Sequence, residues 1–230
     1  MNPRMNRLLA DLPESELKHM APHLRLVSLV KGQNLWLAGE SPDHVYYPVG
    51  ALVSMMNDLP DGYSVASHTF GNTCMVGLGA VQGPSFYRAC VCSSGLAYKM
   101  PVEVWRQIRA CCPHYMARAK EAILRSVRLM SLNMACGKHH TVSQQLIRWI
   151  LVSLDQSDTD VVAMTHLELA EILGFRREAV TLAMVRLAAQ GFLAYSRGDI
   201  HVLNRPGMEA QCCDCYWLAQ DKVRSRSITV

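Results

Sequence analysis

Residues 165–203 read THLELAEILGFRREAVTLAMVRLAAQGFLAYSRGDIHVL. Near their start, Thr165 and Glu168 have the spacing of a capping box, in which the hydroxyl accepts from one free backbone N–H group and the carboxylate from another. This spacing predicts a helix over His166–Leu173. Gly174 is expected to end that helix, because glycine adopts the left-handed conformation of a helix C-terminus without strain.

A second helix is expected to open at about Arg176 and to run to Gln190. Two short helices joined by a glycine turn predict a helix-turn-helix. The β-prone runs Ala194–Ser196 and Ile200–Leu203, with a turn at Arg197-Gly198-Asp199, predict a wing beside it. The apolar positions that the two helices are expected to bury are Leu167, Ala170, Ile172, Leu173, Val180, Ala183, Met184, Leu187 and Ala188.

The first turn of the second helix carries groups that can read DNA. In helix-turn-helix proteins this turn enters the major groove. Arginine can bond guanine through two N–H groups, glutamate accepts from the amino group of cytosine, and threonine or leucine can contact the methyl group of thymine. The start of the first helix is suited to phosphate. The residues expected to bind DNA are Thr165, His166, Arg176, Arg177, Glu178, Thr181 and Leu182. The alternative is a solvated helix pair without a ligand, and the capping box and the wing favour DNA.

The region from about residue 24 to residue 100 has short β-rich runs separated by turns. The runs are Val45–Tyr47, Leu52–Met56, Tyr63–Phe70, Ala89–Val91 and Leu96–Met100. Pro60-Asp61-Gly62 predicts a hairpin, because glycine accepts the positive φ of a tight turn. Regular short strands of this kind favour a small barrel or roll. The opening helical segment, with Leu8, Leu9, Leu12 and Leu17, is expected to pack on its end.

From about His114 the apolar period becomes helical. Met116, Ile123 and Met130 recur every seven residues. Val127 and Met134 lie four positions after Ile123 and Met130. A narrow stripe of this spacing predicts a seam with a partner helix. The alternative is a helix that lies on its own domain. The residues expected at a dimer interface are Met116, Lys120, Ile123, Val127, Met130 and Met134. Gly137 and the polar residues through Thr141 predict a hinge.

Composition limits the class of protein. Half of the 230 residues are hydrophobic and 18% are charged, which predicts a globular chain. No apolar run approaches the roughly 20 residues that span a bilayer, and no signal peptide is evident, so a cytoplasmic location is expected. The net charge is +4, but residues 138–230 carry 10 basic and 10 acidic residues, so composition alone does not indicate DNA binding.

With these patterns in place, the chain resembles the Crp/Fnr superfamily of bacterial transcription regulators. The resemblance rests on Lys31-Gly32-Gln33, Gly39-Glu40, Asp43–Tyr47, the long helix and the segment GFRREAV at Gly174–Val180. It implies an α+β fold: a β-roll of the cyclic-nucleotide-binding type over 1–112, a dimerisation helix and hinge over 113–138, and a winged helix-turn-helix over 139–230.

The resemblance also implies partners and residue roles. Arg177 and Glu178 would read base edges, whereas Leu182 stands where many members have a further arginine, so the target is expected to differ at that base. Arg176 replaces the usual hydroxyl residue and is expected to contact phosphate. The implied partners are double-stranded DNA, a second copy of the chain and RNA polymerase. Two recognition helices about 34 Å apart would bind an imperfect palindrome.

Members that bind cyclic nucleotides carry a phosphate cassette, and its spacing is retained here by Gly77 and Arg88. Leu78 stands in place of the glutamate that binds the ribose, and Ala89 in place of the hydroxyl residue. A ribose facing leucine would lose a charge-assisted hydrogen bond of about 1.5–3 kcal/mol. Cyclic AMP is therefore not expected, although Arg88 could bind another anion or satisfy loop carbonyls. The candidate effector pocket is Gly77, Leu78, Arg88 and Ala89, and no cofactor is required by the sequence.

Nine cysteines offer other inputs. Cys74, Cys90 and Cys92 lie in or beside the cassette region, and Cys212, Cys213 and Cys215 lie near the C-terminus, but no CxxC or histidine spacing predicts a metal site. Haem bound through Cys74 or His68, or a thiol redox sensor on the same fold, remains open. A thiol enzyme is disfavoured because no spacing ties a cysteine to a histidine, so no catalytic residue is predicted and the chain is not expected to be an enzyme.

Overall fold

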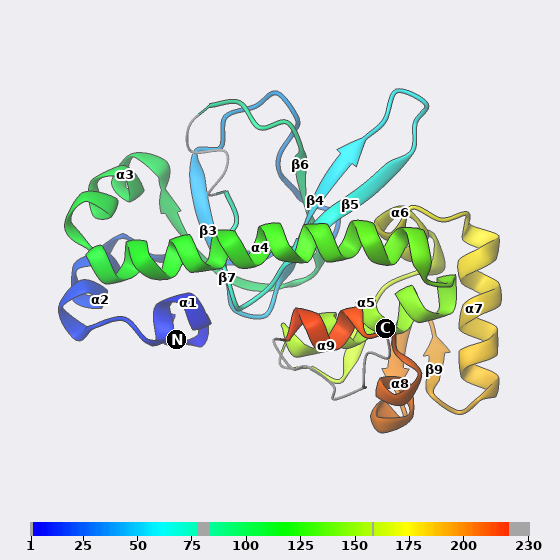
Figure 1. Ribbon diagram of the computed structural model, residues 1–230. Helices are drawn as coiled ribbons and strands as arrows, with labels where there is room; N and C mark the ends of the chain where they lie inside the picture. The colour runs from blue at the N-terminus through cyan, green and yellow to red at the C-terminus, as the bar shows by residue number, and fades with distance from the viewer. Residues whose placement is uncertain (1, 78–82, 158, 221–230) are drawn as a thin grey trace, which may run out of the picture.

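The computed structural model describes residues 2–77, 83–157 and 159–220. It has an N-terminal roll of strands, one long helix lying across it, and a C-terminal domain of helices with a small sheet (Figure 1). The α+β architecture predicted from the sequence is confirmed. Among the described residues, no helix combines the length and the apolar character that a membrane crossing requires.

Two antiparallel sheets build the roll. One has the order β1-β7-β3 and the other β2-β6-β4-β5. The strands are β1 (Arg25–Leu29), β2 (Asn34–Trp36), β3 (His44–Pro48), β4 (Leu52–Asp58), β5 (Ser64–Phe70), β6 (Arg88–Ser93) and β7 (Gly95–Pro101). Apolar side chains of both sheets, among them Leu29, Trp36 and Val53, pack between them. The β4–β5 hairpin turns at Gly62, whose φ of +85° confirms the predicted glycine turn.

Short helices close one end of the roll. They are the 3-10 helices η1 (Pro3–Met5) and η2 (Ala21–His23) and the helices α1 (Arg7–Ala10), α2 (Glu14–Met20) and α3 (Val102–Cys111). The leucines of the opening segment pack there against Tyr47 and Tyr98, as predicted. The Glu16 carboxylate accepts from the backbone N–H groups of His114 and Tyr115 at 3.0 and 2.8 Å. Glu16 thereby satisfies free donors at the start of the long helix.

The long helix α4 (Pro113–His139) has only three buried residues, Tyr115, Ala119 and Cys136. It continues through Gly137, so the predicted hinge lies later than that glycine: the chain leaves the helix at His140, which is extended. One glycine inside a helix costs only about 1 kcal/mol, which a 27-residue helix tolerates. Thr141 then forms a capping box with Gln144 and starts α5 (Val142–Asp155).

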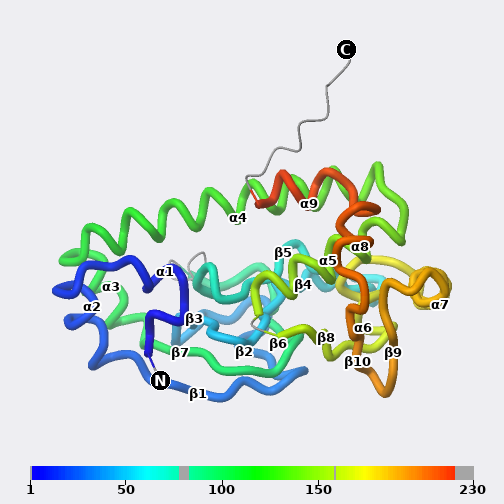
Figure 2. Tube along the Cα trace, turned by 90° about the horizontal axis from the view of Figure 1, so that it is seen from below, coloured from blue at the N-terminus to red at the C-terminus, as the bar shows by residue number. Residues whose placement is uncertain are grey.

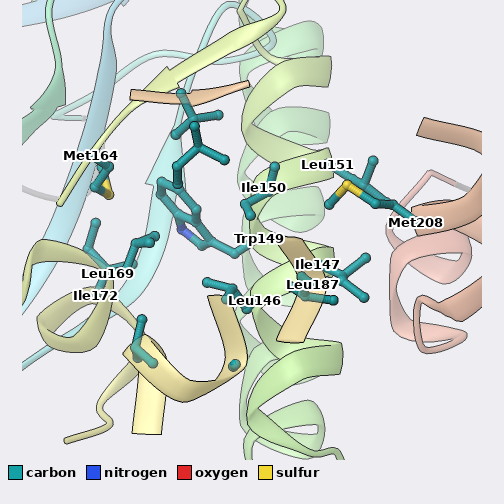
Figure 3. Close-up of a cluster of buried hydrophobic side chains, with 14 of the residues drawn as sticks. Leu146, Ile147, Trp149, Ile150, Leu151, Met164, Leu169, Ile172, Leu187 and Met208 are labelled. Carbon is teal, nitrogen blue, oxygen red and sulfur yellow. The ribbon is translucent and has the colours of Figure 1, made fainter. Parts of the chain in front are cut away.

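The C-terminal domain has its own core. Its elements after α5 are β8 (Val161–Ala163), α6 (His166–Leu173), α7 (Arg177–Ala189), β9 (Leu193–Ser196), β10 (Asp199–Val202), α8 (Arg205–Gln211) and α9 (Cys215–Ala219). Leu146, Trp149 and Ile150 of α5 pack against side chains of α6, α7 and α8 (Figure 3). The sheet has the order β8-β10-β9. Helix α9 lies beside α4 (Figure 2).

Candidate nucleic-acid interface

The predicted start and end of α6 are confirmed. The Thr165 hydroxyl accepts from the backbone N–H of Glu168 at 3.3 Å, and the Glu168 carboxylate accepts from the backbone N–H of Thr165 at 2.6 Å. Gly174 ends the helix with a left-handed φ of +72°. Local capping therefore fixes both ends of α6, and with them the entry of the chain into α7.

The first turn of α7 is open to solvent. Arg176 is the residue before the helix, and Arg176, Arg177 and Glu178 are all exposed. No side chain caps this end of the helix, so its free N–H groups add partial positive charge beside the two arginines. Leu182, one turn later, is 52% exposed. The charged residues predicted to read DNA are thus on the surface and share one helix end.

Two of the predicted DNA-binding residues, His166 and Thr181, form a hydrogen bond with each other. Thr181 is half-buried, and its hydroxyl lies 3.1 Å from Nδ1 of His166. The His166 ring also stacks on Tyr195 of the wing, with the ring centroids 4.3 Å apart. Burial, together with the nearby Arg177 guanidinium, lowers the pKa of His166. This contact joins the first helix, the recognition helix and the wing into one unit.

Six of the nine predicted buried positions of α6 and α7 are buried, and Leu173 is half-buried. Leu167 is 51% exposed and Ala188 is also exposed, whereas Leu169 takes a buried place. The core-facing side of α6 is centred on Leu169, Ala170 and Ile172, which places Leu167 beside that side. Leu167 lines a surface cleft instead.

This cleft, of about 700 Å³, lies between the β4–β5 hairpin and the turn that joins α6 to α7. Tyr63 and Val65 line one side, and Arg176 and Glu178 line the other. A Cβ atom placed on Gly174 would lie 3.1 Å from Val65 Cγ2, so the turn sits directly on the hairpin. The recognition turn is therefore positioned by the roll of its own chain.

Polar contacts also join the two domains. Lys31 of the roll forms an ion pair with the Glu168 carboxylate, Nζ to Oε2 at 2.7 Å, and donates to the carbonyl oxygen of Ala163 at 3.0 Å. Burial opposes ionisation of Glu168, but its bonds to Lys31 and Thr165 outweigh this and lower its pKa. Glu168 is therefore a carboxylate at neutral pH. It bonds to Thr165 within its own domain and to Lys31 of the roll.

The wing is confirmed. Strands β9 and β10 pair in register and turn at Arg197 and Gly198, whose φ values are +52° and +90°. Arg197 is exposed at the tip. Its place at the turn of a wing beside the recognition helix makes it a candidate for phosphate contact. The turn Arg197-Gly198-Asp199 was predicted from the sequence, but Arg197 was not among the residues predicted to bind DNA.

Residues 144–211 match the family model described as the Crp-like helix-turn-helix domain. This segment is a Crp-like helix-turn-helix domain. It spans α5, α6, α7, the wing and α8. The Crp-like domain thus contains every residue predicted to bind DNA. A comparison with curated proteins finds no match.

Solved structures share the fold over most of the chain. A CRP-family transcriptional regulator from Thermus thermophilus has a TM-score of 0.66 at 19% identity, over 87% of this chain and 100% of the other. FixK2 from Bradyrhizobium japonicum has a TM-score of 0.67 at 17% identity, over 83% and 98%. The c-di-GMP responsive regulator CLP from Xanthomonas campestris has a TM-score of 0.65 at 14% identity, over 83% and 99%. Over most of its length the chain therefore has the fold of Crp/Fnr regulators, with the Crp-like domain in its C-terminal part.

The predicted interface residues lie along α4. Lys120, Ile123, Val127 and Met134 are exposed, and Met116 and Met130 are half-buried. The pattern missed Leu124, which is 70% exposed and lies beside the stripe. The long helix therefore packs on its own roll with one side and leaves an apolar side in solvent.

The candidate effector residues are only partly assembled. Arg88 donates through Nε and Nη2 to both carboxylate oxygens of Asp58 at 2.9 and 2.8 Å, and these bonds lower the pKa of Asp58 to about 2. Ala89 is fully buried in β6, and Gly77 has a positive φ. Leu78 lies outside the described residues. A carboxylate of the roll, rather than a loop carbonyl, thus satisfies Arg88.

An apolar cavity of about 190 Å³ lies between the roll and α4. Phe70, Cys74 and Tyr87 line it from the roll, and Ile123 and Val127 from the helix. Burial raises the pKa of Cys74 to about 11, so the thiol is neutral at physiological pH. His68, the other candidate haem ligand, lines a separate cleft, and burial lowers its pKa to about 4.

Sequence spacing tied no cysteine to a histidine, but the structure places two such pairs together. Cys111 Sγ lies 3.4 Å from Nε2 of His19 at the surface. Cys215 Sγ lies 3.7 Å from Nδ1 of His140 in a cluster that also contains Cys136 and Cys213. Sequence spacing did not indicate this cluster, because its two halves, Cys136 with His140 and Cys213 with Cys215, lie more than 70 residues apart.

Proposed function

We propose that this chain is a homodimeric regulator of transcription that binds a specific, pseudo-palindromic DNA site. The observation that carries the proposal is the exposed first turn of α7, with Arg176, Arg177 and Glu178 at the open end of the recognition helix of a Crp-like domain. Arginine beside glutamate at this position offers a donor pair for guanine and an acceptor for cytosine.

The contacts divide into base reading and positioning. Arg177 and Glu178 read base edges, and the exposed Leu182 contacts a thymine methyl group. Arg176, Arg197 and the N-terminus of α6 at Thr165 bind phosphate groups and fix the register. Thr181 and His166 support the reading turn through their contact with each other, so we assign them a positioning role rather than the base contact expected for Thr181.

The dimer forms along α4. Leu124, Val127 and Met134 are each more than half exposed although they are apolar, and they share one side of the helix. A second copy of the same helix, related by two-fold symmetry, covers this stripe with an identical one. Such a dimer presents two recognition helices to one face of DNA about 34 Å apart.

The domain division follows from these roles. Residues 1–112 form the sensory roll, 113–138 the dimerisation helix and 139–230 the DNA-binding domain. The roll does not bind cyclic AMP, because Leu78 and Ala89 lack the polar groups that would hold ribose and phosphate and Asp58 already holds Arg88. RNA polymerase is the partner of the DNA-bound dimer.

Selection of bound sequences from a random DNA library tests the proposal. The purified chain should enrich an imperfect palindrome whose half-sites are one helical turn apart. The affinity for the selected site should fall steeply with added salt, because each neutralised phosphate releases counterions. Enrichment of no sequence, or of sites without two-fold symmetry, would refute sequence-specific binding by a dimer.

A further inference from the structure

Four potential metal ligands converge where the last turn of α4 meets the junction of α8 and α9. The ligand atoms of Cys136, His140, Cys213 and Cys215 all lie within 4.8 Å of one another. The sulfurs of Cys136 and Cys213 are 3.6 Å apart, and Cys215 Sγ is 3.7 Å from His140 Nδ1. The cysteines are buried and the histidine is half-buried.

Local structure explains why these side chains meet. Cys136 and His140 are four residues apart, so they lie on one side of the last helical turn, where the His140 N–H donates to the Cys136 carbonyl at 3.0 Å. Cys213 and Cys215 flank Asp214, the residue before α9. Helix α9 packs along α4 (Figure 2). This packing brings both cysteine sulfurs within 4.8 Å of the Cys136 and His140 ligand atoms.

We propose that these four side chains bind one divalent cation of the zinc class in a tetrahedral Cys3His site. With Zn–S bonds of about 2.3 Å, tetrahedral geometry places two sulfurs about 3.8 Å apart and a sulfur and a nitrogen about 3.6 Å apart. The Cys136–Cys213 and Cys215–His140 pairs, at 3.6 and 3.7 Å, are already close to these separations. Small rotations that bring the two pairs together complete the shell, because all four ligand atoms already lie within 4.8 Å of one another.

The surroundings fit this charge. Three thiolates, a neutral imidazole and a divalent cation leave one net negative charge, and the buried guanidinium of Arg148 acts electrostatically on Cys136 and Cys215. The Gln145 side chain donates to the His140 carbonyl at 2.8 Å and fixes the turn that presents the imidazole.

A site with four protein ligands has no open position for a substrate, which makes this site structural. It joins α4 to the last two helices of the C-terminal domain.

The test uses the full chain, purified under reducing conditions with zinc and then separated from free metal. We expect about one zinc per folded chain. Co²⁺ in place of zinc should give the intense visible bands of a tetrahedral thiolate complex. Cys213→Ser and Cys215→Ser should abolish stoichiometric binding. Cys212→Ser is the matched control, because it removes a neighbouring buried thiol outside the cluster and should retain the metal.

Alkylation of the wild-type chain keeps the proposal testable if the variants fail to fold. In denaturant, Cys136, Cys213 and Cys215 should react with a thiol reagent more slowly in the zinc-loaded chain than in the metal-free chain, whereas the exposed Cys111 should react equally in both. A folded, reduced wild-type chain that binds neither zinc nor cobalt would overturn the proposal. Full binding by Cys213→Ser and Cys215→Ser would also overturn it, as would a Cys136–Cys213 disulfide in place of the metal.

Discussion

Replacing Val127 by glutamate tests the proposed dimer directly. Full burial of a valine side chain contributes about 1.5–3 kcal/mol, and 55% of Val127 is still exposed in the single chain, so covering it contributes about 1 kcal/mol per copy. The substituted carboxylate would be removed from water near its symmetry mate, at a cost of about 2 kcal/mol or more per copy. The two copies together weaken the dimer by about 6 kcal/mol, which is more than ten-thousandfold in Kd.

Sedimentation velocity over a concentration series measures this change. Wild type should sediment as a dimer and Val127→Glu as a monomer at the same concentration. Arg125→Glu is the control, because this exposed residue points away from the stripe on the opposite side of α4 and should leave the dimer intact. A Val127→Glu chain that remains a dimer would show that the stripe is not the interface.

Three further outcomes are expected. Arg177→Ala should cost about 1–3 kcal/mol in specific binding and relax the preference at one base position in repeated selection. Arg186 is exposed further along the same helix, and Arg186→Ala should have neither effect. Unchanged base discrimination by Arg177→Ala would show that Arg177 does not read a base. Calorimetric titration with cyclic AMP should give no heat of binding at micromolar concentrations, and saturable binding would contradict the proposal for the roll. Bonding to Arg88 lowers the Asp58 pKa from 3.8 to about 2, so this carboxylate adds stability that is present above pH 4 and is lost between pH 4 and 2. Asp58→Asn should therefore lower Tm at pH 5 and flatten the dependence of Tm on acid pH. An unchanged profile would count against the ion pair.

Rules that act over a few residues predicted the reading unit well. The capping box at Thr165, the left-handed Gly174 and the turn at Gly198 each depend on one or two neighbours, and all three are present as expected. The apolar side of α4 was also predicted, because a seven-residue repeat persists whatever the helix packs on. Leu167 was misassigned because only packing against α7 and the hairpin decides which side of a short helix is buried.

Features that need distant segments could not be predicted in the same way. The thiol of Cys136 meets Cys213 only because α9 folds back along α4, and no spacing within either segment shows this. The four-residue step from Cys136 to His140 was the available signal, since it places two ligands on one side of a helix. Likewise, the pairing of Arg88 with Asp58 depends on the register of β4 and β6, where Met56 opposes Arg88.

The double engagement of Glu168 has a mechanical consequence. The same carboxylate caps the first turn of α6 and forms the ion pair with Lys31 of the roll. The start of the helix-turn-helix is therefore bonded to both domains. A displacement of the strand connection that carries Lys31 would therefore act on the first turn of α6 through this ion pair. The roll and the helix pair are thus joined by this ion pair and by the packing of the Gly174 turn on the hairpin, in addition to the longer route through α4.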